Sequence, residues 1–296
     1  MTEKEPTINP PDKLAEEALH QRQRDLVEQI KLARQKKDTG RLRVLMEELA
    51  SISLPQPEKG EIAPESLEQA QSLYDWLAIE VDLPKEYQEG KIVLPSPEQQ
   101  EAAEKQGYTL PLIVAGGIGR EELLQKVKDK FAQEFSTPEQ SSQGIIYGDQ
   151  AQKDLSHTQQ AQNSSRPPQS YLIYLPPPRE VSQTQPATMG KTFSQCQEIL
   201  ANLQKENPEL NLQGLTLEEY LLAQALVYQQ DQGHLEEKTW TWLLEEQIIE
   251  RGRPARCLDA DWGPDAREVG VGSSGSSDAD SGGGARFAAV PKESSP

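Results

Sequence analysis

Cysteine, aromatic residues and long apolar runs are all scarce in this sequence. Only Cys196 and Cys257 occur, so a disulfide framework is excluded. Two free thiols in a reducing compartment are favoured over one disulfide. Aromatic residues make up 5% of the 296 residues and hydrophobic residues 35%, less than one large core requires. The composition therefore predicts one modest folded domain, with isolated helices and linker elsewhere.

The longest apolar runs, such as Leu110–Ala115 and Tyr171–Leu175, are far too short to cross a bilayer. The first residues also lack a basic segment followed by an apolar one, which a secretory signal requires. We therefore expect no membrane segment and a cytoplasmic location.

Basic side chains are in deficit as well. The chain has 30 Lys and Arg against 48 Asp and Glu, a formal net charge of -18. Nucleic-acid binding needs a basic surface, and an anionic membrane would repel this charge. Neither partner is expected.

Recognisable catalytic and metal-binding motifs are missing. No CxxC, HExxH or EF-hand pattern occurs, and each of the three histidines is expected to be solvated. Gly116 and Gly117 follow an apolar run and precede a predicted helix, but the spacing fits neither GxGxxG nor a Walker loop. A plain tight turn is the better interpretation. We predict no enzyme activity, no metal and no cofactor.

The chain is expected to divide into five parts: a helical arm or hairpin with linker at 1–60, a small helical or mixed region at 61–135, a Gln/Ser/Pro-rich linker with a short strand at 136–190, a folded domain at 191–290, and a tail at 291–296. In the arm, apolar residues recur at helical spacing at Leu19, Leu26, Ile30 and Ala33. This pattern fits self-association through the arm, and it fits a solvated helix with a narrow apolar edge equally well.

Regular patterns are densest after Thr192. A helix is predicted from Phe193, and Thr216 with Glu219 forms a capping box at the start of a second. Thr239–Leu243 follows as a short alternating strand with tryptophan on one face. The main core is expected here.

The composition changes after residue 250. Between Arg253 and Val290 there is no Lys, Gln or Met. Val269 and Val271 alternate with Gly270 and Gly272, which predicts a strand with the valines buried. The Ser/Gly-rich stretch 272–284 is either a flexible linker or a long loop between two strands.

These segments resemble a group of uncharacterised bacterial proteins whose C-terminal region is similar to the C-type-lectin-like variable domains diversified by retroelements. The resemblance is carried by Gly214–Leu222, Gly233–Leu243, Trp262, Val269–Val271 and Gly284–Phe287. In such families an adenine-directed copying process rewrites AAC-like codons, which yields Ser, Asp, Gly, Ala, Arg, Leu and Cys but never Lys, Gln, Glu, Met or Trp. The residue types missing from the tail fit that process.

The resemblance implies an α+β protein with a small C-terminal C-type-lectin-like domain at 191–290, made of two helices and a small antiparallel sheet. A helical, linker-rich N-terminal region precedes it. The scaffold would include Trp262, Val269, Val271 and Arg286. The displayed, ligand-binding surface would comprise Leu258, Asp259, Asp261, Asp265, Gly270, Gly272, Ser273, Ser274, Ser276, Ser277, Asp278, Asp280 and Ser281.

A surface rich in Asp and Ser would select an unknown protein or another polar or cationic ligand. The sequence thus favours a non-enzymatic binding and display protein. The alternative is a structural or adaptor protein that assembles through its N-terminal helices and has a disordered tail.

Overall fold

The computed structural model describes residues 61–155, 159–160, 166–231, 233–250 and 253–291, together with Arg22, Gln29 and Arg41. Met1–Glu58 and Lys59–Pro296 form two separate units. The predicted arm at 1–60 lies outside the described residues apart from the three single positions, which are helical. Of the predicted tail at 291–296, only Pro291 is described.

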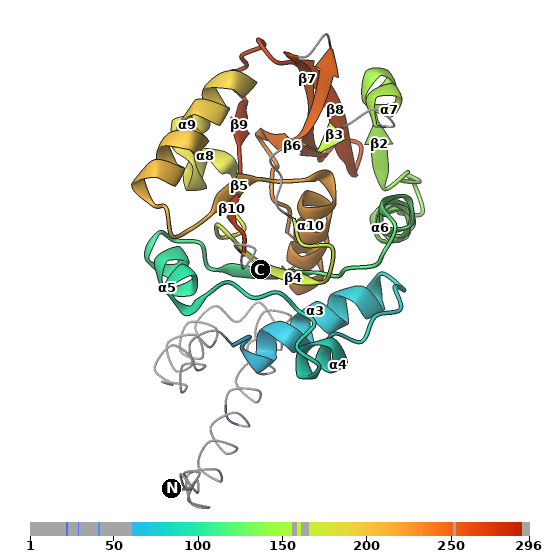
Figure 1. The fold of residues 1–296 in the computed structure, drawn as a ribbon. Helices are drawn as coiled ribbons and strands as arrows, with labels where there is room; N and C mark the ends of the chain where they lie inside the picture. The colour runs from blue at the N-terminus through green and yellow to red at the C-terminus, as the bar shows by residue number, and fades with distance from the viewer. Residues whose placement is uncertain are drawn as a thin grey trace, which may run out of the picture. The chain divides into compact units, whose positions relative to one another are not determined.

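The unit from Lys59 onward is a mixed α+β structure, as predicted (Figure 1). Its first half contains α3 (Pro64–Trp76), α4 (Leu83–Gln88), α5 (Pro97–Lys105), β1 (Leu110–Val114), α6 (Arg120–Phe135), β2 (Ile145–Tyr147), α7 (Asp149–Asp154), β3 (Gln159–Gln160), β4 (Tyr171–Leu175), α8 (Val181–Thr184) and η1 (Pro186–Thr188). Its second half contains α9 (Phe193–Glu206), β5 (Leu212–Gly214), α10 (Leu217–Asp231), β6 (Trp240–Glu250), β7 (Arg253–Gly263), β8 (Glu268–Gly275), β9 (Gly283–Ala285) and β10 (Phe287–Ala289).

The strands form two sheets. The first has the order β1-β4-β10-β5, and all its pairs are antiparallel. The second has the order β2-β8-β7-β6-β3, with β9 also paired to β6. Two of its pairs, β2 with β8 and β6 with β9, are parallel. This sheet is therefore mixed, whereas an antiparallel sheet was expected.

The stretch 136–190, predicted to be mostly linker, supplies strands to both sheets. Tyr174 of β4 pairs with Ala289 of β10, and Ile145 of β2 pairs with Val269 of β8. The boundaries expected at residues 135 and 190 therefore fall inside one unit and are wrong. These strands are only three to five residues long, and their partners are distant in the sequence, so the surrounding polar composition hid them.

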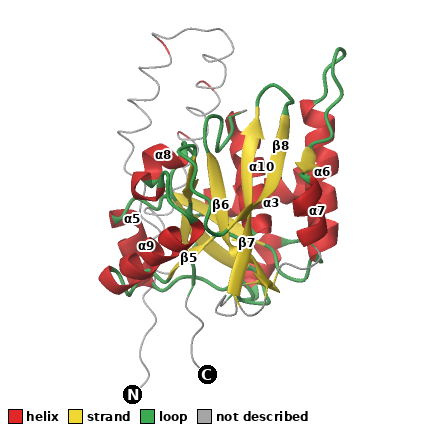
Figure 2. Ribbon diagram, turned by 90° about the horizontal axis from the view of Figure 1, so that it is seen from above, coloured by secondary structure: helices red, strands yellow, loops and turns green. Residues whose placement is uncertain are grey.

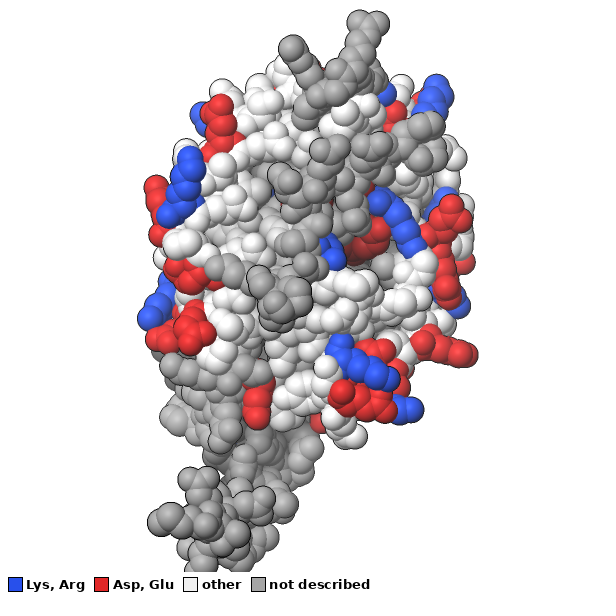
Figure 3. Space-filling view, in the orientation of Figure 1, with Lys and Arg blue, Asp and Glu red and all other residues white. Residues whose placement is uncertain are grey.

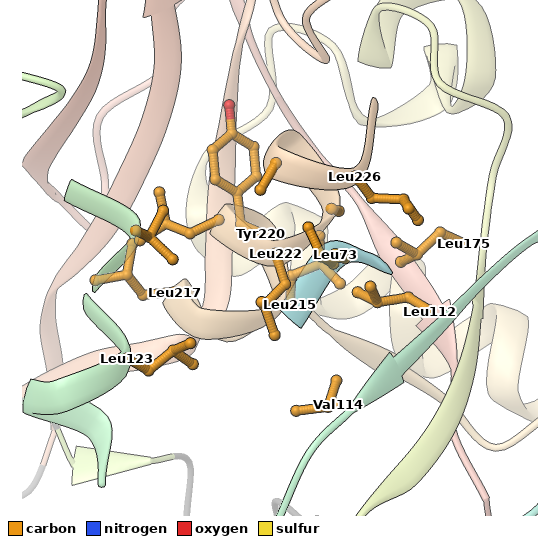
Figure 4. Close-up of a cluster of buried hydrophobic side chains, with 14 of the residues drawn as sticks. Leu73, Leu112, Val114, Leu123, Leu175, Leu215, Leu217, Tyr220, Leu222 and Leu226 are labelled. Carbon is orange, nitrogen blue, oxygen red and sulfur yellow. The ribbon is translucent and has the colours of Figure 1, made fainter. Parts of the chain in front are cut away.

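Helix α10 lies at the centre of the main core. Tyr220, Leu221, Leu222 and Ala225 on successive sides of it are all fully buried. A helix that is apolar on every side must be enclosed by other elements. Figure 4 shows side chains from several elements gathered around it, including Leu73, Leu112, Val114, Leu123 and Leu175.

Several local predictions are confirmed. Helix α9 begins after Thr192, and α10 begins with the predicted capping box, in which the Glu219 amide donates to Thr216 Oγ1 and the Thr216 amide donates to Glu219 Oε2. Strand β6 starts as expected but continues to Glu250. Outside the named strands, Val93 makes a single parallel bridge to Tyr171 of β4.

Helices pack on both faces of the long strands β6, β7 and β8 (Figure 2). One face, called here the inner face, contacts α6, α7 and α10. The opposite, outer face is covered by α9 and η1 only at its β6 and β9 side, where Trp242, Leu244 and Cys257 form a second apolar cluster with Phe193 and Phe287. The rest of the outer face is where six of the thirteen predicted binding residues lie.

Candidate functional site

From Leu258 to Trp262, strand β7 alternates between apolar and acidic side chains. Leu258, Ala260 and Trp262 point inward and are at most 7% exposed. Asp259 and Asp261 point to the outer face and are half-buried. The prediction that Leu258 is displayed is therefore wrong, because it shares the parity of Trp262 and is fully buried in the core.

Strand β8 shows the same division, as predicted. Val269 and Val271 are buried, while Gly270 and Gly272 lie on the outer face opposite the two aspartates. In the register of the β7–β8 pair, Gly270 faces Asp261 and Gly272 faces Asp259.

The outer face carries a shallow groove of about 370 Å³. It is lined by Ile146, Gly148, Trp240, Asp259, Asp261, Gly270, Val271, Gly272, Ser274 and Asp280. Ile146 on β2 and Trp240 on β6 stand on opposite sides of β8 and β7. Three strand spacings separate β2 from β6, so the groove is roughly 14 Å across. Six of the predicted surface residues meet in this one depression.

The glycines of β8 make room for the carboxylates of β7. A Cβ atom built on Gly270 would collide with Oδ1 of Asp261, and one built on Gly272 would collide with Oδ1 of Asp259. Each aspartate side chain thus lies across the glycine opposite it. The groove is floored by these two cross-strand Asp–Gly pairs.

Negative charge is concentrated in the groove without a lining cation. Burial, together with the nearby Asp261 carboxylate, raises the pKa of Asp259 to about 6, against hydrogen bonds from Ser274 and from the Gly272 amide that lower it. Burial and the charge of Glu236 likewise raise the pKa of Asp261. Elsewhere, on the face drawn in Figure 3, acidic and basic side chains lie interspersed.

The other predicted site residues lie away from the groove. Ser273 is on the inner face, where its hydroxyl donates to Asp154 of α7. Asp265 is exposed in the turn between β7 and β8. The remaining predicted residues of the loop between β8 and β9 do not line the groove: Ser276, Ser277, Asp278 and Ser281.

The aspartates of that loop also shape it. Oδ2 of Asp278 accepts the Gly275 amide at 2.9 Å, and Oδ1 of Asp280 accepts the Gly282 amide at 2.8 Å. Such side-chain to backbone bonds are typical of turns. The loop is therefore an ordered connection, as expected for a loop between two strands.

Sequence reasoning missed the two walls of the groove. Trp240 lies in the predicted strand Thr239–Leu243, which was given no binding role. Ile146 lies in the region 136–190, which was predicted to be mostly linker. The Ile-Ile-Tyr run of β2 is the signal that was available, since a short β-branched segment favours a strand. Its pairing with β8 joins residues too distant to be inferred from spacing.

Both thiols are free and buried, in agreement with the favoured interpretation. Burial raises the pKa of the Cys196 thiol to about 12 and that of Cys257 well above its ordinary value, so neither is suited to nucleophilic chemistry. Contrary to the prediction, His234 is not a solvated side chain. Its ring stacks on that of Trp262, with the ring centroids 3.6 Å apart, and it hydrogen-bonds Gln224. His20 and His157 lie outside the described residues.

Within the described residues, no cluster of three or more His, Cys, Asp or Glu side chains has the geometry of a metal site. Over the same residues, no helix is both long and apolar enough to span a membrane. Comparison with protein-family models, curated proteins and solved structures finds no match for this chain.

Proposed function

We propose that this chain is a non-enzymatic binding protein that displays a diversified ligand-binding surface on a fixed C-type-lectin-like scaffold. The observation that carries the proposal is the separation of β7 and β8 into two faces. Residues of the inner face are locked in the core, whereas their sequence neighbours line an open groove. A surface arranged in this way can change its side chains while the strands beneath keep their packing.

Three features of the structure support the proposed scaffold. Helices α9 and α10 flank the strands, and the last strand, β10, returns to pair with β5 and β4. Arg286, predicted as scaffold, is 1% exposed and ion-paired with Glu236. The four residues predicted as scaffold, which are Trp262, Val269, Val271 and Arg286, are all buried.

The residue types of the groove fit adenine-directed diversification. The six predicted residues that line it are Asp, Gly or Ser, all of which that process yields. By the same reasoning Trp240 belongs to a fixed position, because tryptophan is not a product. A template repeat near the gene, differing from the codons of residues 253–290 only at adenines, is the expected genomic counterpart.

Two matched libraries test the proposal. One randomises the outward positions Asp259, Asp261, Gly270, Gly272 and Ser274 of the full chain. The other randomises the inward positions Leu258, Ala260, Trp262, Val269 and Val271. With both displayed on yeast and challenged with protease, most outward variants should remain resistant and most inward variants should be cleaved. Equal losses in the two libraries would contradict a display role.

A further inference from the structure

The groove has an unused capacity to accept hydrogen bonds. Asp259 already accepts from the Ser274 hydroxyl at 2.8 Å. Asp261, in contrast, has no hydrogen bond or ion pair to any residue that the structure describes. The carboxylate of Asp280 adds a third negative charge on the Trp240 side. No lysine or arginine lies in the lining that the structure describes, so the carboxylate oxygens that lack a donor there are open to solvent or to a ligand.

The walls of the groove are apolar. Ile146 is 38% exposed, which is high for a large hydrophobic residue of this protein. Trp240 is half-buried, and its ring packs over Gly283, where a Cβ atom would collide with it. An indole held rigidly at the edge of an acidic depression suits a cation carried on an aliphatic stem, because the ring attracts the charge and the stem covers apolar surface.

We infer that the groove binds a polypeptide segment presenting an arginine or lysine side chain, with the charged end over Asp259 and Asp261 and the aliphatic stem against Trp240. This inference rests on the proposed function and names the class of partner. Two residues apart on one strand, the aspartates lie roughly 7 Å from each other along β7. Arginine is the better fit, because its planar guanidinium offers five donors in a fixed fork.

The groove is large enough for one such side chain and the backbone that carries it. The groove is roughly 14 Å wide. A single extended chain fits within this width, whereas a broad protein face does not. Gly270 and Gly272 project no side chains of their own, so nothing of theirs stands between the incoming group and the Asp261 and Asp259 carboxylates that lie across them.

The test titrates the full chain, labelled with ¹⁵N, with the peptide acetyl-Gly-Gly-Arg-Gly-Gly-amide and follows amide and indole shifts by NMR. Peptides with Lys, Gln or Glu in place of Arg are the comparisons. A single-residue contact should give a dissociation constant of about 1 mM. The Arg and Lys peptides should shift the Trp240 indole and the Gly270 and Gly272 amides, and the Gln and Glu peptides should not.

Variants separate this site from general attraction to an acidic protein. The double substitution D259N/D261N should weaken Arg-peptide binding at least tenfold. D265N removes a carboxylate from the exposed turn at the end of the same strand, and it should change binding by less than twofold. Backbone amide shifts of both variants away from the groove report whether the fold is retained.

Three results would overturn the inference: no saturable shift at 10 mM Arg peptide, equal shifts with the Gln peptide, or unchanged binding by D259N/D261N. Tighter binding of spermine than of the Arg peptide would instead assign the groove to a free polyamine, and would overturn the polypeptide partner. None of these outcomes alters the library experiment, so the partner class can fail while the display function stands.

Discussion

Removal of Arg286 should destabilise the protein more than any change in the groove. The guanidinium is 1% exposed, and its Nη2 lies 2.6 Å from Oε1 of Glu236, which is itself fully buried. Nη2 also donates to the Arg179 carbonyl, while Glu236 accepts from the Val181 amide and the Thr239 hydroxyl. In R286M the methionine fills part of the space but leaves a buried carboxylate without its counter-charge.

Breaking a buried ion pair by removing one partner costs about 3–5 kcal/mol. For a unit of this size, each 1 kcal/mol lowers Tm by roughly 2–4 °C, so R286M should lose roughly 6–20 °C. E236Q should lose a similar amount, because an uncompensated guanidinium remains. In the double variant E236Q/R286M, neither of these two buried charges remains. Its loss of stability should therefore be smaller than the sum of the two single losses.

The measurement is a double-mutant cycle by urea unfolding, followed by tryptophan fluorescence, with D265N as an exposed control of unchanged stability. The coupling between the two sites should be about 2 kcal/mol or more. If R286M costs less than about 1 kcal/mol, or if the two losses simply add, then the pair does not hold the C-terminal strands in place and the reasoning fails.

Two further predictions concern one glycine each of β9 and β8, and a buried acid. G283A should destabilise the protein by about 1–3 kcal/mol, because the new methyl group meets the rigid Trp240 ring. G272A should cost less than about 1 kcal/mol, because its methyl group meets only the end of the flexible Asp259 carboxylate. Equal shifts of Tm for the two variants would contradict this. Burial raises the pKa of Glu245 from 4.5 to about 7, so its contribution to stability is full below pH 4.5 and is lost as pH rises through 7. E245Q should therefore increase the free energy of unfolding, measured by urea, by about 1–3 kcal/mol at pH 8 and have little effect at pH 5. A change that is the same at both pH values would show that Glu245 does not titrate in this range.

What the sequence could predict is local. The Thr216–Glu219 capping box depends on two residues three apart, and the burial of Val269 and Val271 depends on alternation within one strand. Leu258 was within reach of the same rule. Leu258 lies four residues before Trp262 in the same strand, so alternation places both side chains on the buried face. The prediction that Leu258 is displayed followed the composition of the tail and not this alternation.

What could not be predicted depends on pairing across long sequence separations. β4 is five residues long and stands between β1 and β10, while Ile146 reaches the groove only because β2 lies beside β8. A window of sequence contains no information on such partners when the strand is this short. The Gln- and Ser-rich residues 136–143 before β2 are mostly exposed, and composition averaged them with the buried residues of the strand.

Buried ion pairs connect the same distant parts. Arg166 bonds Glu219, Arg256 bonds Asp154, and in each pair the partners are more than 50 residues apart in the sequence. Such contacts require the surrounding backbone to be correct before either charge is compensated, so they favour one arrangement of the strands over its alternatives. The positions that specify the fold are thus charged and apolar residues beneath the sheet, and none of them lines the outer groove apart from Val271 at its floor. Under the proposed function, the groove residues can vary because most buried residues of β7 and β8 lie on the opposite face of these strands.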